Sequence, residues 1–273
     1  MKMELYKIIA LTNMHVGSGD INFGVVDNLV QKDPITRLPN INGSSLKGAF
    51  REHFEKENSK NLVEYIFGPD NQSNDSHRTG AYSFFEAEIL TRPVRSNKKA
   101  YFNATSPIVI KSLLEKIDNF SIEFNDNLKK ALEEFANLKP KDKPFIFEDI
   151  KNVILEDYNA EYKEFRNISI LESFLGKDLA LFDDESFREL ELPVIARNRL
   201  ENGESKNLWY EEIVPKKTTF FFVLGKPTNV SPEDSKKIQG FENRFNNEGM
   251  RLQIGANKSI GYGFCKIERI ENE

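Results

Sequence analysis

Residues 41–51 read INGSSLKGAFR and predict the first helix of the chain. The apolar residues recur at the spacing of one buried helical stripe, and they are Leu46, Ala49, Phe50 and Phe54. Two features weaken this helix: an interior glycine, which costs about 1 kcal/mol relative to alanine, and Lys47 and Arg51, which repel one another across one turn. We therefore expect an anion or a closely approaching backbone to lie against this face.

The segments on either side of the helix predict strands. Residues 4–16 form an apolar, β-rich run typical of a central strand, and residues 80–92 predict a second strand. A loop rich in glycine and proline covers residues 17–43. Loops of this length in compact domains tend to be functional.

The second half of the chain predicts an insertion, a hairpin and further strands. Residues 111–192 are interpreted as a mostly helical insertion. Two extended arms within residues 193–215 flank Asn202-Gly203, which is a hairpin turn sequence. Residues 218–225 predict a buried strand, and Ser231-Pro232 predicts the start of a helix.

This order of elements predicts the α+β class, with a ferredoxin-like core. The predicted parts are residues 1–110 as the N-terminal part of the core, 111–192 as the insertion, 193–215 as the hairpin, and 216–273 as the C-terminal part of the core with a glycine-rich loop.

The composition limits the classes of function. The 273 residues suffice for one elaborated domain or two smaller ones, and the net charge of -5 means that any anion must bind to a local basic patch. The single cysteine, Cys265, excludes a disulfide within the chain and a zinc site built on cysteines, and we expect it in the core. No apolar run reaches membrane-spanning length, so we expect a cytoplasmic protein.

Nucleotide-binding loops and nucleophile triads are not indicated. The segment GSSLKG lacks the spacer of a phosphate-binding loop, and GSG at residues 17–19 precedes no helix. The chain has three histidines and no GxSxG motif.

The start of the first helix is a candidate anion site. The backbone N–H groups after Gly43, with Ser44 and Ser45, lie at the positive end of the helix dipole, and Lys47 and Arg51 add two cations. A solvated pair of cations on an ordinary amphipathic helix is the alternative.

The segment IGANKSIGYGF, residues 254–264, is a second candidate contact. Gly255, Gly261 and Gly263 permit a close backbone approach, Lys258 brings a charge, and an aromatic ring offers a stacking surface. A plain tight loop between two strands is the alternative, and the pattern alone favours it.

Asp27 is a candidate catalytic residue, because it lies in the long loop near the predicted anion site. RNA cleavage needs a base at the 2′-hydroxyl or a metal-bound water, and a carboxylate suits either task. Turn chemistry is the commoner use of an Asp-Asn pair. The basic run Arg92, Arg95, Lys98 and Lys99 predicts a solvated loop or a second phosphate contact.

Several motifs together resemble the RAMP superfamily of CRISPR-associated proteins. In chain order they are MHVGSG, VVDNLVQKDP, GSSLKGAFR, FFEAEILTRPVRS, LPVIARNRLENG, LWYEE and IGANKSIGYGF. Within the superfamily the sequence resembles the repeated backbone subunit, subunit 4, of type III-B (Cmr) effector complexes over nearly its whole length.

The resemblance implies a ferredoxin-like, RNA-recognition-type fold whose copies stack along a guide CRISPR RNA together with other effector subunits. It implies that the Lys47 helix and the glycine-rich loop hold guide phosphates, and that the hairpin, with Arg197 and Arg199, acts as a thumb. Asp27 would cut single-stranded target RNA at regular intervals, and the products would be a 2′,3′-cyclic phosphate and a 5′-hydroxyl.

His15 and Glu211 fall at positions that resemble further residues near the cleavage site. The implied reaction depends on Mg²⁺ or another divalent cation, although no metal ligands are assigned. Asp27 would act as a metal ligand, as a base, or by twisting the displaced nucleotide.

Three alternatives remain open: a filament subunit without catalysis, a type III-A counterpart, and a guide-processing endonuclease. The chain also departs from the family pattern at three positions. Arg37 and Ala256 each stand where a glycine is common, and Asn42 replaces a proline.

Overall fold

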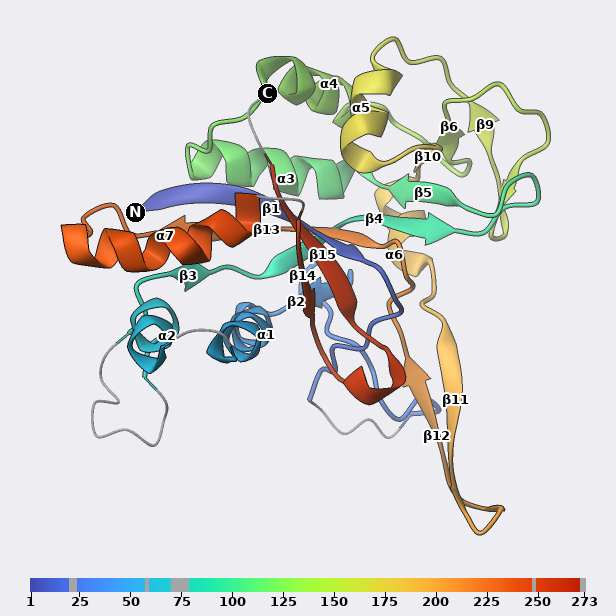
Figure 1. Cartoon of the computed structure of the whole chain (residues 1–273). Helices are drawn as coiled ribbons and strands as arrows, with labels where there is room; N and C mark the ends of the chain where they lie inside the picture. The colour runs from blue at the N-terminus through green and yellow to red at the C-terminus, as the bar shows by residue number, and fades with distance from the viewer. Residues whose placement is uncertain (20–23, 57–58, 70–78, 247–248, 271–273) are drawn as a thin grey trace.

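One large mixed sheet with helices on both faces forms the body of the protein (Figure 1). The computed structural model describes residues 1–19, 24–56, 59–69, 79–246 and 249–270. The strands are β1 (Lys2–Ala10), β2 (Asn40–Ile41), β3 (Ser83–Phe84), β4 (Ala87–Val94), β5 (Phe102–Thr105), β6 (Phe145–Ile146), β7 (Ile154–Leu155), β8 (Tyr158–Asn159), β9 (Glu161–Tyr162), β10 (Leu179–Leu181), β11 (Val194–Glu201), β12 (Glu204–Glu212), β13 (Thr219–Lys226), β14 (Met250–Gln253) and β15 (Phe264–Arg269). The helices are α1 (Gly43–Glu55), α2 (Lys60–Phe67), α3 (Pro107–Asn119), α4 (Asp126–Ala136), α5 (Ile168–Leu175), α6 (Asp184–Glu189), α7 (Pro232–Asn246) and the 3₁₀ turn η1 (Lys258–Ile260).

The main sheet has the strand order β14-β15-β1-β13-β4-β5-β10-β6-β9, with β2 also paired to β4 and β3 to β13. Strands β15, β1, β13 and β4 are antiparallel neighbours, whereas β10 joins β5 in parallel. After β1 the chain pairs briefly with the sheet as β2 before α1, whereas α7 directly follows β13. The predicted α+β class is confirmed.

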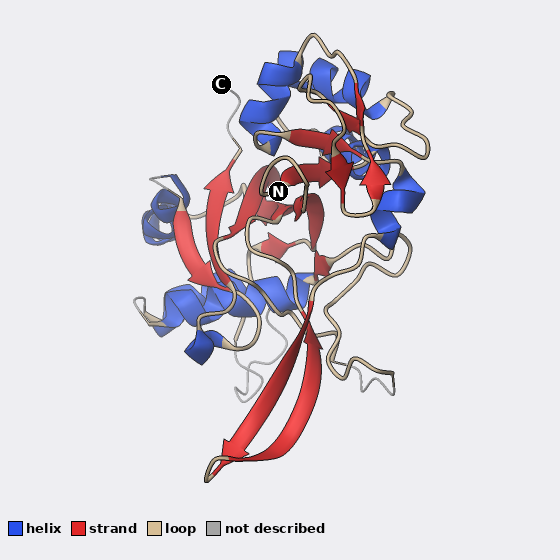
Figure 2. Cartoon of the chain, turned by 90° about the vertical axis from the view of Figure 1, so that its right-hand side faces the viewer, coloured by secondary structure: helices blue, strands red, loops and turns tan. Residues whose placement is uncertain are grey.

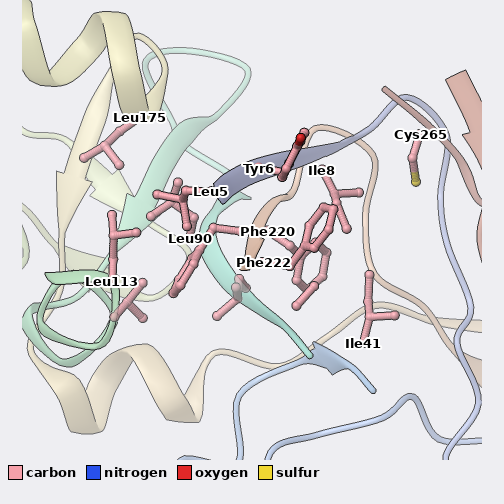
Figure 3. Packing of buried hydrophobic residues seen from close by; sticks show 14 of the residues in the cluster. Leu5, Tyr6, Ile8, Ile41, Leu90, Leu113, Leu175, Phe220, Phe222 and Cys265 are labelled. Atoms are coloured by element: carbon pink, nitrogen blue, oxygen red, sulfur yellow. The ribbon is translucent and has the colours of Figure 1, made fainter. Parts of the chain in front are cut away.

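The sheet is buried on both faces because its central strands are apolar on both. Figure 3 shows Leu5 of β1 on the side of Leu113 and Leu175, which belong to the helices of the insertion. The next residue, Tyr6, stacks on Phe222 of β13 with 5.3 Å between ring centroids. This alternation places one helical layer on each face of the sheet.

Helix α1 forms where the sequence predicts it and packs through the predicted stripe. Leu46, Phe50 and Phe54 are buried, and the Phe50 ring lies 5.9 Å from Phe222 of the sheet. The Phe54 ring lies 4.5 Å from Phe241 of α7. Because the apolar face of α1 packs against the core, the opposite face of the helix, with Lys47, lies at the surface.

The predicted strands at both ends of the core are present with shifted limits. Strand β1 ends at Ala10, before the predicted 16, and Met14 pairs separately with Val214. The predicted strand at 80–92 is divided into β3 and β4. Helix α7 begins as predicted, since the hydroxyl of Ser231 accepts a hydrogen bond from the backbone N–H of Asp234 at 3.1 Å.

The segment 111–192 is more mixed than predicted. It contains α4, α5, α6 and most of α3, but it also contributes strands β6 to β10. The buried residues Leu179–Leu181 extend the main sheet as β10, between β5 and β6. Short apolar segments of this kind cannot be distinguished from helix by periodicity alone, so the sheet extension was not predicted.

The predicted hairpin is formed by β11 and β12, which project from the body (Figure 2). Asn202 and Gly203 both have positive φ, 53° and 85°, as a two-residue hairpin turn requires. Within the described residues, no helix has the length and apolar character needed to cross a membrane.

Replacing Phe50 with alanine should lower the free energy of unfolding by about 3–5 kcal/mol, because it leaves a cavity between α1 and the sheet. Urea unfolding of the isolated chain measures this loss. Val25→Ala is the control, since that side chain is 86% exposed. A loss at Phe50 no larger than the control's would contradict the packing described for α1.

Candidate functional site

The loop that carries Asp27 lies against strand β12 of the hairpin. The backbone N–H of Asp27 donates to the carbonyl of Tyr210 at 3.0 Å, and the N–H of Tyr210 donates to Oδ2 of Asp27 at 2.7 Å. Asn28 continues this pairing, because its carbonyl accepts the N–H of Glu212 at 2.9 Å. Asp27 is exposed, so the hairpin holds an accessible carboxylate in a defined place.

His15 is a buried residue that contacts two elements of the site. Its side chain is buried, and Nδ1 lies 2.7 Å from the carbonyl oxygen of Glu212. Since that carbonyl only accepts, Nδ1 must donate. The His15 carbonyl accepts the N–H of Ala256 at 2.8 Å. His15 thus contacts both the hairpin and the glycine-rich loop.

Glu211 connects the same two elements through its carboxylate. It is 5% exposed, and Oε2 accepts hydrogen bonds from Nε of Arg197 at 3.0 Å and from Nδ2 of Asn257 at 2.9 Å. The Arg197 guanidinium also lies over the Tyr262 ring, 4.6 Å from its centroid. The structure therefore brings the candidate residues Asp27, His15 and Glu211 into one region, together with Asn257, which was not predicted.

Glu212, which was also not predicted, secures the other end of the Asp27 loop. Its carboxylate accepts the N–H of Val30 at 3.1 Å and Nζ of Lys32 at 2.8 Å. The sequence signal that could have indicated the role of Glu212 was the pair Glu211-Glu212. Consecutive strand residues point to opposite sides of the strand, and each buried carboxylate needs hydrogen-bond donors of its own.

Gln31 attaches the loop to the start of α1. Its amide donates to the hydroxyl of Ser45 at 3.0 Å and accepts the N–H of Asn42 at 2.8 Å. The first turn of α1 has no side-chain cap and no acidic residue, and Ser44 is exposed. The predicted anion site is thus held beside the Asp27 loop.

The predicted cations near α1 differ in their surroundings. Lys47 is half-buried, with no ion pair among the described residues. Arg51 donates to Oε1 of Glu55 at 2.6 Å and to the carbonyl of Gly68 at 2.8 Å. Lys258 of the glycine-rich loop pairs with Glu52 of α1 at 2.8 Å, and this hydrogen bond raises the pKa of Lys258. Helix α1 and the glycine-rich loop, which are the two elements predicted to contact guide phosphates, are therefore adjacent.

The glycines of the 254–264 loop serve two different needs. Gly255, Gly261 and Gly263 all have positive φ. A Cβ at Gly255 would lie 2.3 Å from the His15 carbonyl oxygen, and one at Gly263 would lie 2.1 Å from the carbonyl oxygen of Ile254. A Cβ at Gly261 would meet no atom of the described residues within 4 Å. The tight-loop alternative thus accounts for two of these glycines.

Three of the predicted basic contacts lie apart from this cluster. Arg92 is not in a solvated loop: it is buried in β4, and its guanidinium donates to the carbonyls of Leu190 at 2.8 Å and Glu191 at 2.6 Å. Burial lowers the pKa of Arg92 to about 10. We therefore correct its assignment from a phosphate contact to a structural residue that holds the segment leading into β11.

Arg95 and Arg199 are exposed but paired. Arg95 contacts Glu156 through two nitrogens, at 2.6 and 3.0 Å, and Arg199 lies 2.9 Å from Glu201.

Cys265 is buried as predicted, and burial raises the pKa of its thiol to about 12.

The predicted divalent cation has no ligand cluster among the described residues near Asp27. Among the described residues, no group of three or more His, Cys, Asp or Glu side chains could hold a metal ion. One Asp27 oxygen already accepts a backbone hydrogen bond. The described residues around Asp27 do not supply the near-octahedral oxygen ligands that a resident Mg²⁺ takes.

A family model described as the RAMP superfamily matches residues 7–266 of the chain. The chain belongs to the RAMP superfamily. A curated relative, the CRISPR system Cmr endoribonuclease Cmr4 of Pyrococcus furiosus, is 32% identical over 294 residues, which cover 98% of this chain and 95% of the relative.

Solved structures agree with this membership. The crystal structure of oligomeric Cmr4 from Pyrococcus furiosus has a TM-score of 0.74 and 25% identity, with 99% of this chain and 100% of that chain covered. A chain of the type III-B Cmr-beta complex bound to cognate target RNA has a TM-score of 0.81 at 23% identity, with 99% and 98% covered, and shows the shared fold.

The departure from the family pattern at Arg37 has a structural consequence. Arg37 has a φ of 61°, the left-handed region in which glycine carries no Cβ penalty. This turn thus has a left-handed residue that carries a side chain. At Ala256 the φ is not positive, and the left-handed residue is Asn257, with a φ of 65°.

Gly255→Ala should destabilise the chain, because the new Cβ meets the His15 carbonyl and the positive φ is retained. We expect a loss of about 1–3 kcal/mol in the free energy of unfolding, measured by urea denaturation. Gly240→Ala in α7 is the matched control, because a Cβ there meets no described atom within 4 Å. Equal stability of the two variants would contradict the close contact at His15.

Proposed function

We propose that this RAMP protein is a backbone subunit of a type III-B CRISPR effector complex, which binds guide RNA and cleaves complementary target RNA through Asp27. The observation that carries the proposal is Asp27 itself, an exposed carboxylate that the backbone of β12 holds in a loop attached to the start of α1 through Gln31. The near full-length similarity to a Cmr endoribonuclease supports the same function.

The fold proposal is a ferredoxin-like core with a thumb. The antiparallel order β15-β1-β13-β4, with α1 after β1 and α7 after β13, supports the core. The projecting β11–β12 hairpin supports the thumb (Figure 2).

Guide RNA would contact the surface formed by α1 and the glycine-rich loop. The uncapped first turn of α1 offers N–H donors to a phosphate, and Lys47 and Lys258 add positive charge. Further copies of the chain and other effector subunits would complete the complex.

The proposed reaction is cleavage by the neighbouring 2′-hydroxyl of the target RNA. The 2′-oxygen loses its proton and bonds to phosphorus, while the bond to the 5′-oxygen breaks and that oxygen gains a proton. These changes give a 2′,3′-cyclic phosphate and a 5′-hydroxyl. Asp27 would accept the 2′-hydroxyl proton or hold the nucleotide in line for attack.

Asp27→Ala should abolish evenly spaced cleavage by the reconstituted, guide-loaded complex while assembly and target binding persist. We expect a rate loss of about 10²–10⁴-fold, as for the removal of a positioned acid–base group. Cleavage should be followed with and without Mg²⁺, which tests the metal dependence that the family resemblance implies.

Asp149→Ala is the matched control, since Asp149 is an exposed carboxylate in the insertion. If Asp27→Ala cleaved as fast as this control, the chain would be a scaffold and another residue or subunit would cut the RNA.

Gly48→Ala should have opposite effects on the free chain and on RNA binding. No described atom outside the helix backbone lies within 4 Å of a Cβ at Gly48, so alanine should stabilise α1 by about 1 kcal/mol. If guide RNA lies close to this face, the methyl group should weaken guide binding. Unfolding and RNA filter-binding assays measure the two effects.

Lys47→Ala is the companion variant and should lower the salt slope of guide binding by about 1. Lys111→Ala, an exposed lysine of α3, is its control. If RNA affinity is unchanged in both α1 variants, this helix face is an ordinary solvated surface that does not contact guide RNA.

A further inference from the structure

The carboxylate of Glu211 joins two elements that are far apart in the sequence. One donor to Oε2 is Arg197 of β11, within the hairpin. The other is Asn257 of the glycine-rich loop, 46 residues after Glu211 in the chain. Because the carboxylate is buried, the loss of either donor would leave charge poorly solvated. The two hydrogen bonds therefore fix the hairpin base against the loop.

This connection bears directly on Asp27. The strand that carries Glu211 also carries Tyr210, whose backbone N–H donates to the Asp27 carboxylate. Asn28, the neighbour of Asp27, forms a parallel bridge with Glu211 itself. A shift of β12 relative to the glycine-rich loop would therefore move Asp27 relative to any RNA that this loop holds.

The surroundings of Glu211 do not suit a general acid or base. Such a group must come within hydrogen-bond distance of the substrate proton. The Glu211 carboxylate is 5% exposed, and its Oε2 already serves two donors. Asp27, by contrast, is exposed. The resemblance placed Glu211 near the cleavage site, and its contacts are those of a residue that acts through another.

We infer that Glu211, with Arg197 and Asn257, positions Asp27 relative to the guide-binding loop; this inference rests on the proposed function. Asn257 is suited to the task because its backbone is in the left-handed conformation, with a φ of 65°, which asparagine tolerates well. Arg197 is held in turn by the Tyr262 ring of the same loop. The loop that contacts the guide thereby sets the place at which the target is cut.

The experiment compares four variants in the reconstituted, guide-loaded complex: Asn257→Gly, Glu211→Gln, Glu211→Ala and Asp27→Ala. Glycine keeps the left-handed backbone at 257 and removes only the amide donor. Glutamine keeps an oxygen that accepts both hydrogen bonds but has no acid–base function. The readouts are target affinity, the cleavage rate at saturating target, its pH profile and the positions of the cuts.

Asn257→Gly should slow cleavage at saturating target by about tenfold, since misplacement of a reacting group by about 1 Å costs up to 10²-fold. Target affinity and the pH profile should be unchanged. Glu211→Gln should retain most of the activity, and Glu211→Ala should lose more than Asn257→Gly. Asn97→Ala is the matched control: its side chain also bridges two segments, to Asn152 and Ile154, and it should cleave like the wild type.

Each adverse outcome has its own meaning. Cleavage that survives Asp27→Ala would overturn the proposed function. If Asp27→Ala is inactive but Asn257→Gly cleaves like Asn97→Ala, the positioning inference fails and the proposed function stands. A Glu211→Gln variant that is inactive, or that has an altered pH profile, would make Glu211 an acid–base group. Arg197→Lys, assayed with thermal unfolding, tests the same bridge if Asn257→Gly does not fold.

Discussion

The attachment of the Asp27 loop to β12 is the contact on which the whole site depends. Two consecutive carboxylates flank it on opposite sides of the strand. Glu212 holds Val30 and Lys32 of the loop, while Glu211 holds Arg197 and Asn257. Both carboxylates are less than a tenth exposed, and a buried charge must keep its donors. Strand β12 is thereby fixed between the Asp27 loop and the glycine-rich loop.

The ion pairs of Glu211 and Glu212 fix the geometry of the site more than they stabilise the fold. Removing two charges from water costs about as much as their attraction returns, so apolar residues of similar size often give an equally stable protein. Apolar contacts, however, permit sliding, whereas hydrogen bonds at 2.9 and 3.0 Å to a single oxygen do not. A reaction that needs in-line geometry benefits from that restriction. The polar cluster at the hairpin base is consistent with this need, while the aromatic contacts of α1 supply the stability.

The sequence predicted the elements whose signals are local. The stripe containing Leu46 and Phe50 specifies α1, and Asn202-Gly203 specifies the hairpin turn. Arg92 was placed wrongly because its partner, the carbonyl of Leu190, lies 98 residues later in the chain. Strand β10 was missed because it pairs with β5 and β6 only in the folded state. In the site, the same limit applies to Asn257, whose link to Glu211 exists only after the core has formed.

The glycines can be divided into those that the fold itself requires and those for which the fold gives no reason. Gly255 and Gly263 sit where a Cβ would collide with backbone carbonyls, so the fold alone requires them. Gly48 sits inside a helix, where a Cβ would meet no described atom outside the helix backbone within 4 Å, and alanine would favour the helix by about 1 kcal/mol. The described residues therefore give no reason for this glycine. A closely approaching backbone on the Lys47 face supplies one, since it needs both the missing side chain and the adjacent positive charge.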